Sequence, residues 1–207
     1  LILNDYDVEF KGNAKSEALF NLAKRLKNSG IPIDGVGLQC HFDVGQVDAK
    51  QLSENIRRYQ DIGLSCSITE LDIAISSAKT DEAFAQQAKD YKNICKAMLM
   101  NDNCPILMVW GITDNASWRQ PGAPLLYDSN VNRKPAWYAV RSAFRKAAKE
   151  IELSIDELPV TGSSRLLRQE YYTLTGMRLQ EAPQTHHPFI LRNIYEDGSV
   201  KVRKVVK

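Results

Sequence analysis

The sequence predicts an α/β protein in which four consecutive βα units are followed by a small β appendage. Four short apolar runs are typical of buried strands, and they span Leu1 to Asn4, Gly35 to His41, Ser65 to Glu70 and Ile106 to Trp110. Helical patterns lie between these runs. Continuous apolar strands that alternate with helices indicate a parallel sheet covered by helices.

Each of the four expected helices repeats apolar residues at helical spacing. Start signals stand near Asp48, Thr80 and Pro135, and Gly30 and Gly63 are stop signals. The apolar positions are Leu19, Leu22 and Leu26 in the first helix; Leu52, Ile56 and Tyr59 in the second; Phe84, Ala88, Tyr91, Ile94 and Met98 in the third; and Ala139, Val140, Ala143 and Phe144 in the fourth.

The composition changes after about Leu158, where we place a domain boundary. A small, turn-rich stretch covers residues 159–164. Beyond it, β-hairpins are expected from three strand patterns and two turns. The strands are Glu170 to Leu174, Pro188 to Ile194 and Val200 to Val206, and the turns are Thr175-Gly176 and Asp197-Gly198.

Charge and composition exclude several classes of function. Lys and Arg number 27 against 25 Asp and Glu, a net charge of +2 that gives no electrostatic footprint for nucleic acid or an anionic membrane. No apolar run approaches the ~18 to 20 residues of a membrane span. The sequence holds no metal cluster with ligand spacing and no phosphate loop, so neither a metal nor a cofactor is expected.

The four cysteines form no CxxC pair, which excludes a zinc ribbon or a thioredoxin-like motif. Cys40 and Cys66 fall inside apolar strand-like runs, where buried free thiols are expected. Cys95 and Cys104 lie across an expected helix end, and a disulfide between them stays open.

Polar or aromatic residues follow all four expected strands. In parallel α/β folds the carboxyl ends of the strands carry the functional site. The residues are Asn4, Asp5 and Tyr6 after the first strand, Gln39 and His41 after the second, Glu70 and Asp72 after the third, and Trp110, Asp114 and Trp118 after the fourth.

Strand side chains alternate between faces, so Gln39 shares a face with His41, and Glu70 with Asp72. If the second and third strands are neighbours, His41 lies beside the two carboxylates. A carboxylate next to an imidazole that a second carboxylate orients can be kept ionised as a nucleophile. Taken singly, Glu70 as a cap, His41 as a core residue and Trp110 as packing are competing interpretations.

These residues stand in motifs that resemble the second half of a family 10 glycoside hydrolase. The blocks LILNDYD, GIPIDGVGLQCHF, GLSCSITELDI, VWGITDNASW and PLLYDSNVNRKPAWYAV occur in this order, from Leu1 to about Phe144. Members of the family are endo-β-1,4-xylanases on a (β/α)₈ barrel. The resemblance therefore implies the C-terminal half of a TIM barrel.

The resemblance also implies roles for individual residues. Glu70 would be the nucleophile of a retaining mechanism, His41 would hydrogen-bond it, and Asp72 would orient His41. The substrate-binding residues would be Asn4, Tyr6, Gln39, Trp110 and Trp118.

The sequence departs from the family because it has no WDVVNE-like block, which carries the acid/base Glu. Retaining hydrolysis needs two carboxyl groups ~5 to 5.5 Å apart, and Asp72 cannot be the missing acid if it orients His41. Asp5 and Asp114 are the nearest other carboxylates. We expect half an active site, a missing N-terminal barrel half as partner, and self-association through open barrel edges.

The tail has a weaker resemblance to C-terminal sorting tails of the type IX secretion route. It rests on a Tyr-x-Leu-x-Gly-x-x-Leu strand that starts at Tyr172, an Ile-rich strand and a closing Lys-Val-x-Lys, although His186 and His187 stand where such tails usually carry Gly. This resemblance implies a secreted or cell-surface protein.

The sequence therefore predicts a catalytic half-domain at residues 1–158 and a β-rich sorting tail at residues 159–207. The predicted activity is retaining hydrolysis of internal β-1,4-xylosidic bonds in xylan. The alternatives are a non-catalytic carbohydrate-binding or structural barrel remnant, and another βα-barrel enzyme with a different substrate.

Overall fold

The computed structural model describes residues 1–156, 165–172, 178–181, 189–196 and 200–205. The chain divides into two compact units, Leu1–Arg145 and Lys146–Lys207. The boundary expected near residue 158 lies outside the described residues, as do the two expected hairpin turns and the histidines at 186 and 187.

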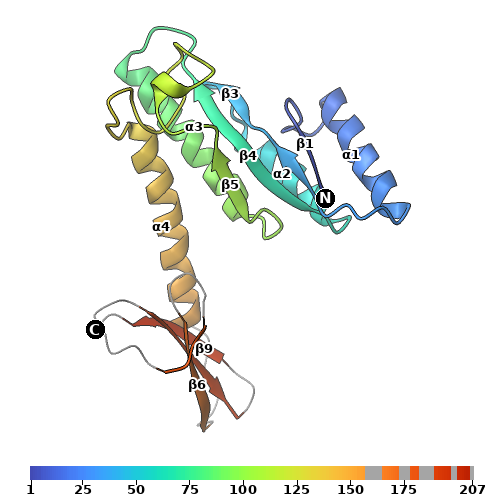
Figure 1. Cartoon of the computed structure of the whole chain (residues 1–207), viewed down its shortest axis with the longest axis vertical. Helices are drawn as coiled ribbons and strands as arrows, with labels where there is room; N and C mark the ends of the chain where they lie inside the picture. The colour runs from blue at the N-terminus through green and yellow to red at the C-terminus, as the bar shows by residue number, and fades with distance from the viewer. Residues whose placement is uncertain (157–164, 173–177, 182–188, 197–199, 206–207) are drawn as a thin grey trace. The chain divides into compact units, whose positions relative to one another are not determined.

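The first unit is built on an open parallel sheet. Its main strands β1, β2, β4 and β5 lie side by side in chain order (Figure 1). A further short strand, β3, pairs in parallel with the carboxyl half of β4. The strands are β1 (Ile2–Asp5), β2 (Gly35–Leu38), β3 (His41–Asp43), β4 (Ser65–Ala74) and β5 (Ile106–Val109).

Helices follow the strands, as expected. The side chains of Asn13, Asp48 and Thr80 cap the first three helices by accepting hydrogen bonds from amides of the first turn. Gly30 and Gly63 have left-handed backbones after α1 and α2, a conformation that glycine adopts without strain. The helices are α1 (Ala14–Asn28), α2 (Ala49–Gln60), α3 (Asp81–Leu99) and α4 (Pro135–Asp156), with the short η1 (Asp114–Ala116) before α4.

The core lies between the sheet and its helices. Leu52 and Ile56 of α2 and Tyr91 and Ile94 of α3 are fully buried, as their helical spacing predicts. Burying each such side chain stabilises the fold by about 1.5–3 kcal/mol. Leu22 of α1 is 36% exposed, because α1 lies at the end of the sheet beside the edge strand (Figure 1).

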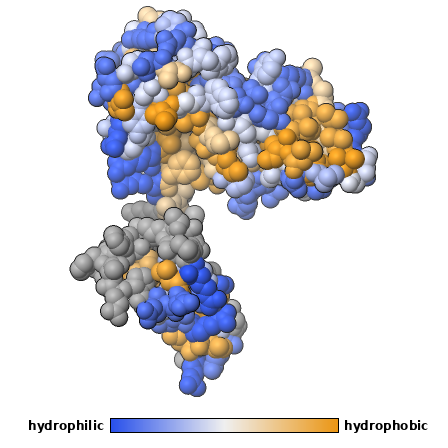
Figure 2. Space-filling model, in the orientation of Figure 1, coloured by the Kyte–Doolittle hydropathy of each residue, from blue (hydrophilic) through white to orange (hydrophobic). Residues whose placement is uncertain are grey.

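The other face of the sheet carries exposed apolar side chains. Ile2 of β1 is 46% exposed, and Ile106 and Met108 of β5 are 44% and 49% exposed. Figure 2 shows hydrophobic surface around the β1–α1 end and near β5. Within the described residues β1 and β5 each have one strand neighbour, so both edges of the sheet are open.

The second unit contains an antiparallel sheet of order β7-β6-β8-β9. Phe189 and Leu191 are buried on one face, and Glu170 is buried on the other. The strands are β6 (Leu166–Tyr172), β7 (Arg178–Leu179), β8 (Phe189–Tyr195) and β9 (Val200–Val205).

All four cysteines are buried free thiols, so the disulfide left open for Cys95 and Cys104 does not form. The thiol of Cys104 lies near those of Cys40 and Cys66 in the core. Burial raises the pKa of Cys95 and of Cys104 to about 12.

None of the helices in the described part of the chain combines the length and apolar content that a bilayer crossing requires.

Candidate active site

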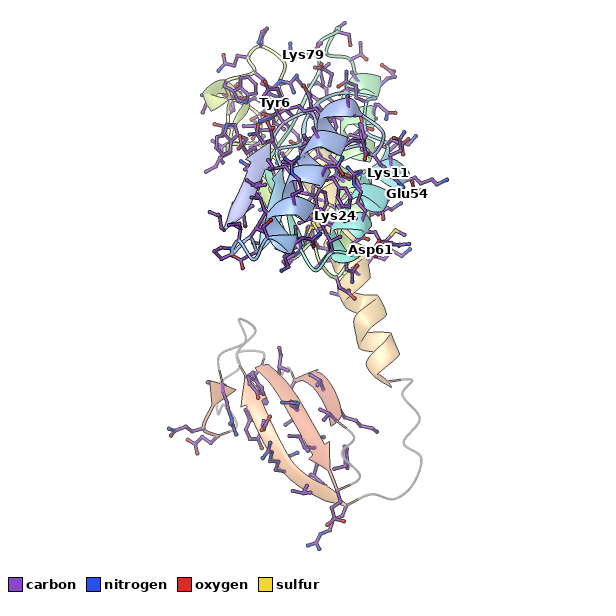
Figure 3. The ribbon with its side chains drawn as sticks, turned by 90° about the vertical axis from the view of Figure 1, so that its right-hand side faces the viewer. Tyr6, Lys11, Lys24, Glu54, Asp61 and Lys79 are labelled. Atoms are coloured by element: carbon purple, nitrogen blue, oxygen red, sulfur yellow. The ribbon has the colours of Figure 1, made fainter. Side chains whose placement is uncertain are left out.

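The predicted site residues gather at the carboxyl end of the parallel sheet. Parallel pairing brings the ends of β1, β2 and β4 to the same edge, as the register of Asp5 with Leu38 and of Leu38 with Ile68 shows. Figure 3 shows Tyr6 at this end of the first unit and Asp61, which follows α2, at the opposite end.

The strand expected to run from Gly35 to His41 is broken. β2 ends at Leu38, and Cys40 has a left-handed backbone with φ 62° before β3 begins at His41. The buried Glu9 side chain accepts a hydrogen bond from the Cys40 amide at 2.8 Å, which stabilises this uncommon conformation. Simple alternation therefore does not hold between Gln39 and His41, although both side chains reach the same cavity.

A linear hydrogen-bonded cluster links Asn4, Glu70, His41 and Asp72. Asn4 Nδ2 donates to Glu70 Oε1 at 2.9 Å, and Glu70 Oε2 lies 3.3 Å from His41 Nε2. On the other side of the ring, His41 Nδ1 lies 3.0 Å from Asp72 Oδ2. The close neighbours expected from the sequence are thus together, and each nitrogen of the imidazole faces a carboxylate.

Burial and charge set the protonation of His41. Burial by itself lowers the pKa of the imidazole, but the hydrogen bonds and charges of Asp72 and Glu70 outweigh it and raise the pKa above the usual value. The His41 and Glu70 side chains are only 15% and 13% exposed, and Asp72 is fully buried. A protonated His41 can donate to both carboxylates at once.

Two donors to Asp72 come from consecutive residues of the loop after η1. Trp118 Nε1 donates to Asp72 Oδ2 at 2.9 Å, and Arg119 Nη1 donates to Asp72 Oδ1 at 3.0 Å. Trp118 was expected to contact the sugar, and Arg119 was not among the residues predicted for the site. Nothing in the spacing of the sequence signals that this loop folds back over β3 and β4.

The cluster opens into a cavity of about 490 Å³ with aromatic walls. Tyr6, Trp110 and Trp118 are about half exposed or more, which leaves ring surface free for a ligand. Lys15 Nζ lies 3.3 Å from the centre of the Tyr6 ring and donates to the Tyr6 carbonyl oxygen. The lining residues are Tyr6, Asp7, Gln39, His41, Glu70, Trp110, Trp118 and Arg119.

Other carboxylates lie in different places from those expected. Asp5 accepts hydrogen bonds from Lys15 Nζ and the Tyr6 amide, and neither Asp5 nor Asp114 lines the cavity. Asp114 is buried, where it pairs with Lys134 at 3.0 Å and accepts from the Leu125 amide. Asp7 is the acidic residue that lines the cavity together with Glu70.

Among the described residues no group of three or more His, Cys, Asp or Glu side chains has the arrangement of a metal site. The geometry supplies one carboxylate, that of Glu70, which Asn4 and His41 hold at a cavity with aromatic walls. Aromatic walls and a few convergent polar groups are typical of pockets that orient a polar ligand.

Known proteins of one family match the first unit of this chain. The model of the family described as glycosyl hydrolase family 10 matches residues 1–143. An endo-1,4-beta-xylanase B from Thermotoga neapolitana is 34% identical over 156 residues, which are 72% of this chain and 45% of that protein.

Two solved structures are similar as well. The crystal structure of xylanase 10B from Thermotoga maritima has a TM-score of 0.69 and 35% identity, over 72% of this chain and 48% of that one. Xylanase 10B from Thermotoga petrophila RKU-1, solved in complex with xylobiose, has a TM-score of 0.67 and 36% identity, over 73% and 47%. The chain therefore spans less than half the length of these relatives, and its first unit is confirmed as a partial (β/α)₈ barrel.

Proposed function

The chain belongs to glycosyl hydrolase family 10, and from that premise we propose that it supplies the nucleophile half of a retaining endo-β-1,4-xylanase site. The observation that carries the proposal is the restraint on Glu70. Its two carboxylate oxygens are held by Asn4 and His41 at a cavity whose walls are aromatic.

In the proposed reaction, a Glu70 oxygen attacks the anomeric carbon of a xylosyl unit as the glycosidic oxygen leaves with a proton. The product is a covalent ester between the sugar and Glu70, and a water molecule then hydrolyses that ester with retention of configuration. Asp72 holds the His41 ring in place, and His41 holds Glu70 in the line of attack.

The walls of the cavity suit a sugar chain. Tyr6, Trp110 and Trp118 present flat apolar faces to the C–H faces of xylose rings, and the Gln39 amide can hydrogen-bond sugar hydroxyls. We assign Asn4 to holding Glu70, because its side-chain amide donates to Glu70 Oε1. In this proposal, binding of the sugar is a second role of Asn4. A xylobiose complex of a relative supports this class of substrate.

The proton for the leaving group must come from an acid. We assign this acid to a part of the barrel that residues 1–207 do not include, in keeping with the share of the relatives that the chain spans. A partner barrel half would also cover Ile2, Ile106 and Met108 on the open face. Without it, we expect the chain to self-associate, which sedimentation at micromolar concentration would detect.

Covalent trapping tests the nucleophile without needing the acid. A 2-deoxy-2-fluoro-β-xylobioside with a dinitrophenyl leaving group needs little protonation, and its glycosyl–enzyme ester hydrolyses slowly. We expect a xylobiosyl adduct on the peptide that contains Glu70, and no adduct in Glu70→Gln. Asp7→Asn is the matched control and should still be labelled. An adduct elsewhere, or none on a chain that binds xylobiose, contradicts the proposal.

Turnover of xylan tests the half-site. Protonation of the leaving group by a general acid accelerates cleavage ~10²- to 10⁴-fold. An aryl xylobioside with an acidic phenol needs little of this protonation, so the chain alone should cleave it far better than xylan. Robust cleavage of xylan by the chain alone would mean that a carboxylate of this chain is the acid. Loss of that cleavage in Asp7→Asn would then identify it, because Asp7 lines the cavity.

We further propose that residues 159–207 are a sorting tail that directs export to the cell surface. The hydrogen-bonded sheet of β6 to β9 supports a module separate from the parallel sheet. The test is the localisation of the full chain and of a chain without residues 159–207 in a bacterium with the type IX route. Export that is unaffected by the deletion would contradict this role.

A further inference from the structure

Arg119 joins the loop after η1 to two strands of the candidate active site. Its Nη1 donates to the Phe42 carbonyl oxygen at 2.6 Å and to Asp72 Oδ1 at 3.0 Å, and its Nη2 donates to Asp43 Oδ1 at 3.0 Å. The side chain is only 18% exposed. The planar guanidinium is thereby fixed in one orientation beside a fully buried carboxylate.

The charge balance of the cluster depends on this residue. With Asp72, Glu70 and Asp43 ionised and His41 protonated, the four side chains carry a net charge of −2, which Arg119 reduces to −1. The hydrogen bond from the Arg119 guanidinium to Asp72 Oδ1 is charge-assisted and occupies one oxygen of that carboxylate. It also disfavours transfer of the imidazole proton to Asp72.

We propose that Arg119 is a positioning residue that acts through Asp72 to keep the proton of the cluster on His41, which leaves Glu70 anionic. The catalytic meaning of this assignment rests on the proposed nucleophile role of Glu70. The electrostatic effect itself does not, because it is a property of the free protein.

Other charged and aromatic groups face His41 from the elements packed around it. Asp72 and Glu70 of β4 contact its two nitrogens, and the Trp118 ring packs edge-on against it at 5.1 Å between centroids. Asp7 lines the same cavity. Asp43 shares Arg119 but is 37% exposed, so that solvent screens its charge more than that of Asp72.

Histidine side-chain NMR of the full ¹⁵N-labelled chain, without substrate, tests the proposal. The chain has three histidines, and the His41 signals are those lost in His41→Gln. In Arg119→Met, loss of the guanidinium should let the imidazole proton move to Asp72 and give neutral-imidazole ¹⁵N shifts at His41, whereas an imidazolium that persists to higher pH would contradict the proposal. Arg119→Lys keeps the charge and should restore most of the native titration.

Arg133→Met is the matched control, because Arg133 lies over the Trp137 ring, outside the cluster. Thermal unfolding followed by tryptophan fluorescence confirms that each variant is folded. If the Met variant does not fold, Arg119→Gln, which keeps an N–H donor for Phe42, carries the same outcomes. A folded Arg119→Met or Arg119→Gln with the titration of Arg133→Met would overturn the assignment and would leave covalent labelling of Glu70 unaffected.

Discussion

Replacing Asp72 by Ala should destabilise the first unit, because this fully buried carboxylate accepts from three different side chains. The donors are His41 Nδ1 at 3.0 Å, Trp118 Nε1 at 2.9 Å and Arg119 Nη1 at 3.0 Å. In the variant all three lose Asp72 as acceptor at once, and Arg119 Nη1 keeps the Phe42 carbonyl oxygen. The His41 and Arg119 charges are then left without their buried partner.

The size of the effect follows from these contacts. A hydrogen bond to a charged group contributes about 1.5–3 kcal/mol, so three of them give an upper bound of about 4.5–9 kcal/mol. Trp118 is 64% exposed, and the His41 and Arg119 side chains are 15% and 18% exposed, so each regains some water. We therefore expect a loss of about 3 kcal/mol, at the lower end of the range for a broken buried ion pair.

Tryptophan fluorescence during urea unfolding of the full chain measures this loss. The three tryptophans stand at residues 110, 118 and 137, so the signal reports on the first unit. A loss of about 3 kcal/mol corresponds to a fall of about 6–12 °C in Tm. The control is Asp43→Ala, which removes a carboxylate that is 37% exposed from the same arginine and should cost less than about 1 kcal/mol. A loss below about 1 kcal/mol in Asp72→Ala, or equal losses in both variants, would refute the reasoning.

Three further measurements follow from the structure. Gly37→Ala would place a Cβ 2.4 Å from Asn4 Oδ1, so we expect the Asn4–Glu70 hydrogen bond to break and the crystal structure of the variant to show Asn4 displaced. Because the folded-state pKa of His41 is raised, the stability that it contributes is complete below its unfolded pKa of about 6.5 and is lost as pH rises through the folded value. Urea midpoints should accordingly fall above about pH 6.5, and His41→Gln should flatten this dependence; an equal slope in both proteins would contradict it. The four buried thiols should resist Ellman's reagent at pH 8 in the native chain and react in 6 M guanidinium, and rapid labelling of the native protein would show that the core is open.

Patterns among residues close together in the sequence predicted most of the helices and strands of the first unit. The helices that begin after Asp48 and Thr80 do so because an oxygen of each side chain accepts from amides of the first turn, which is a property of adjacent residues. The apolar runs likewise mark β1, β2, β4 and β5, and their alternation with helices specifies a parallel sheet. His41, Glu70 and Asp72 could be placed together because parallel strands end at a common edge.

The sequence by itself therefore determined the order of the elements, the parallel sheet and the group of residues at its carboxyl edge. Only the tertiary structure decided the break at Cys40, the contact of Asn4 with Glu70 and the position of Arg119 on Asp72. Each of these depends on a partner far away in the chain: Glu9 for Cys40, β4 for Asn4, and β3 with β4 for Arg119. Periodicity and capping depend on residues that are neighbours in the sequence, so they can be recognised without a structure. A hydrogen bond between distant residues leaves no periodic pattern, because its geometry forms only once the strands and loops have packed.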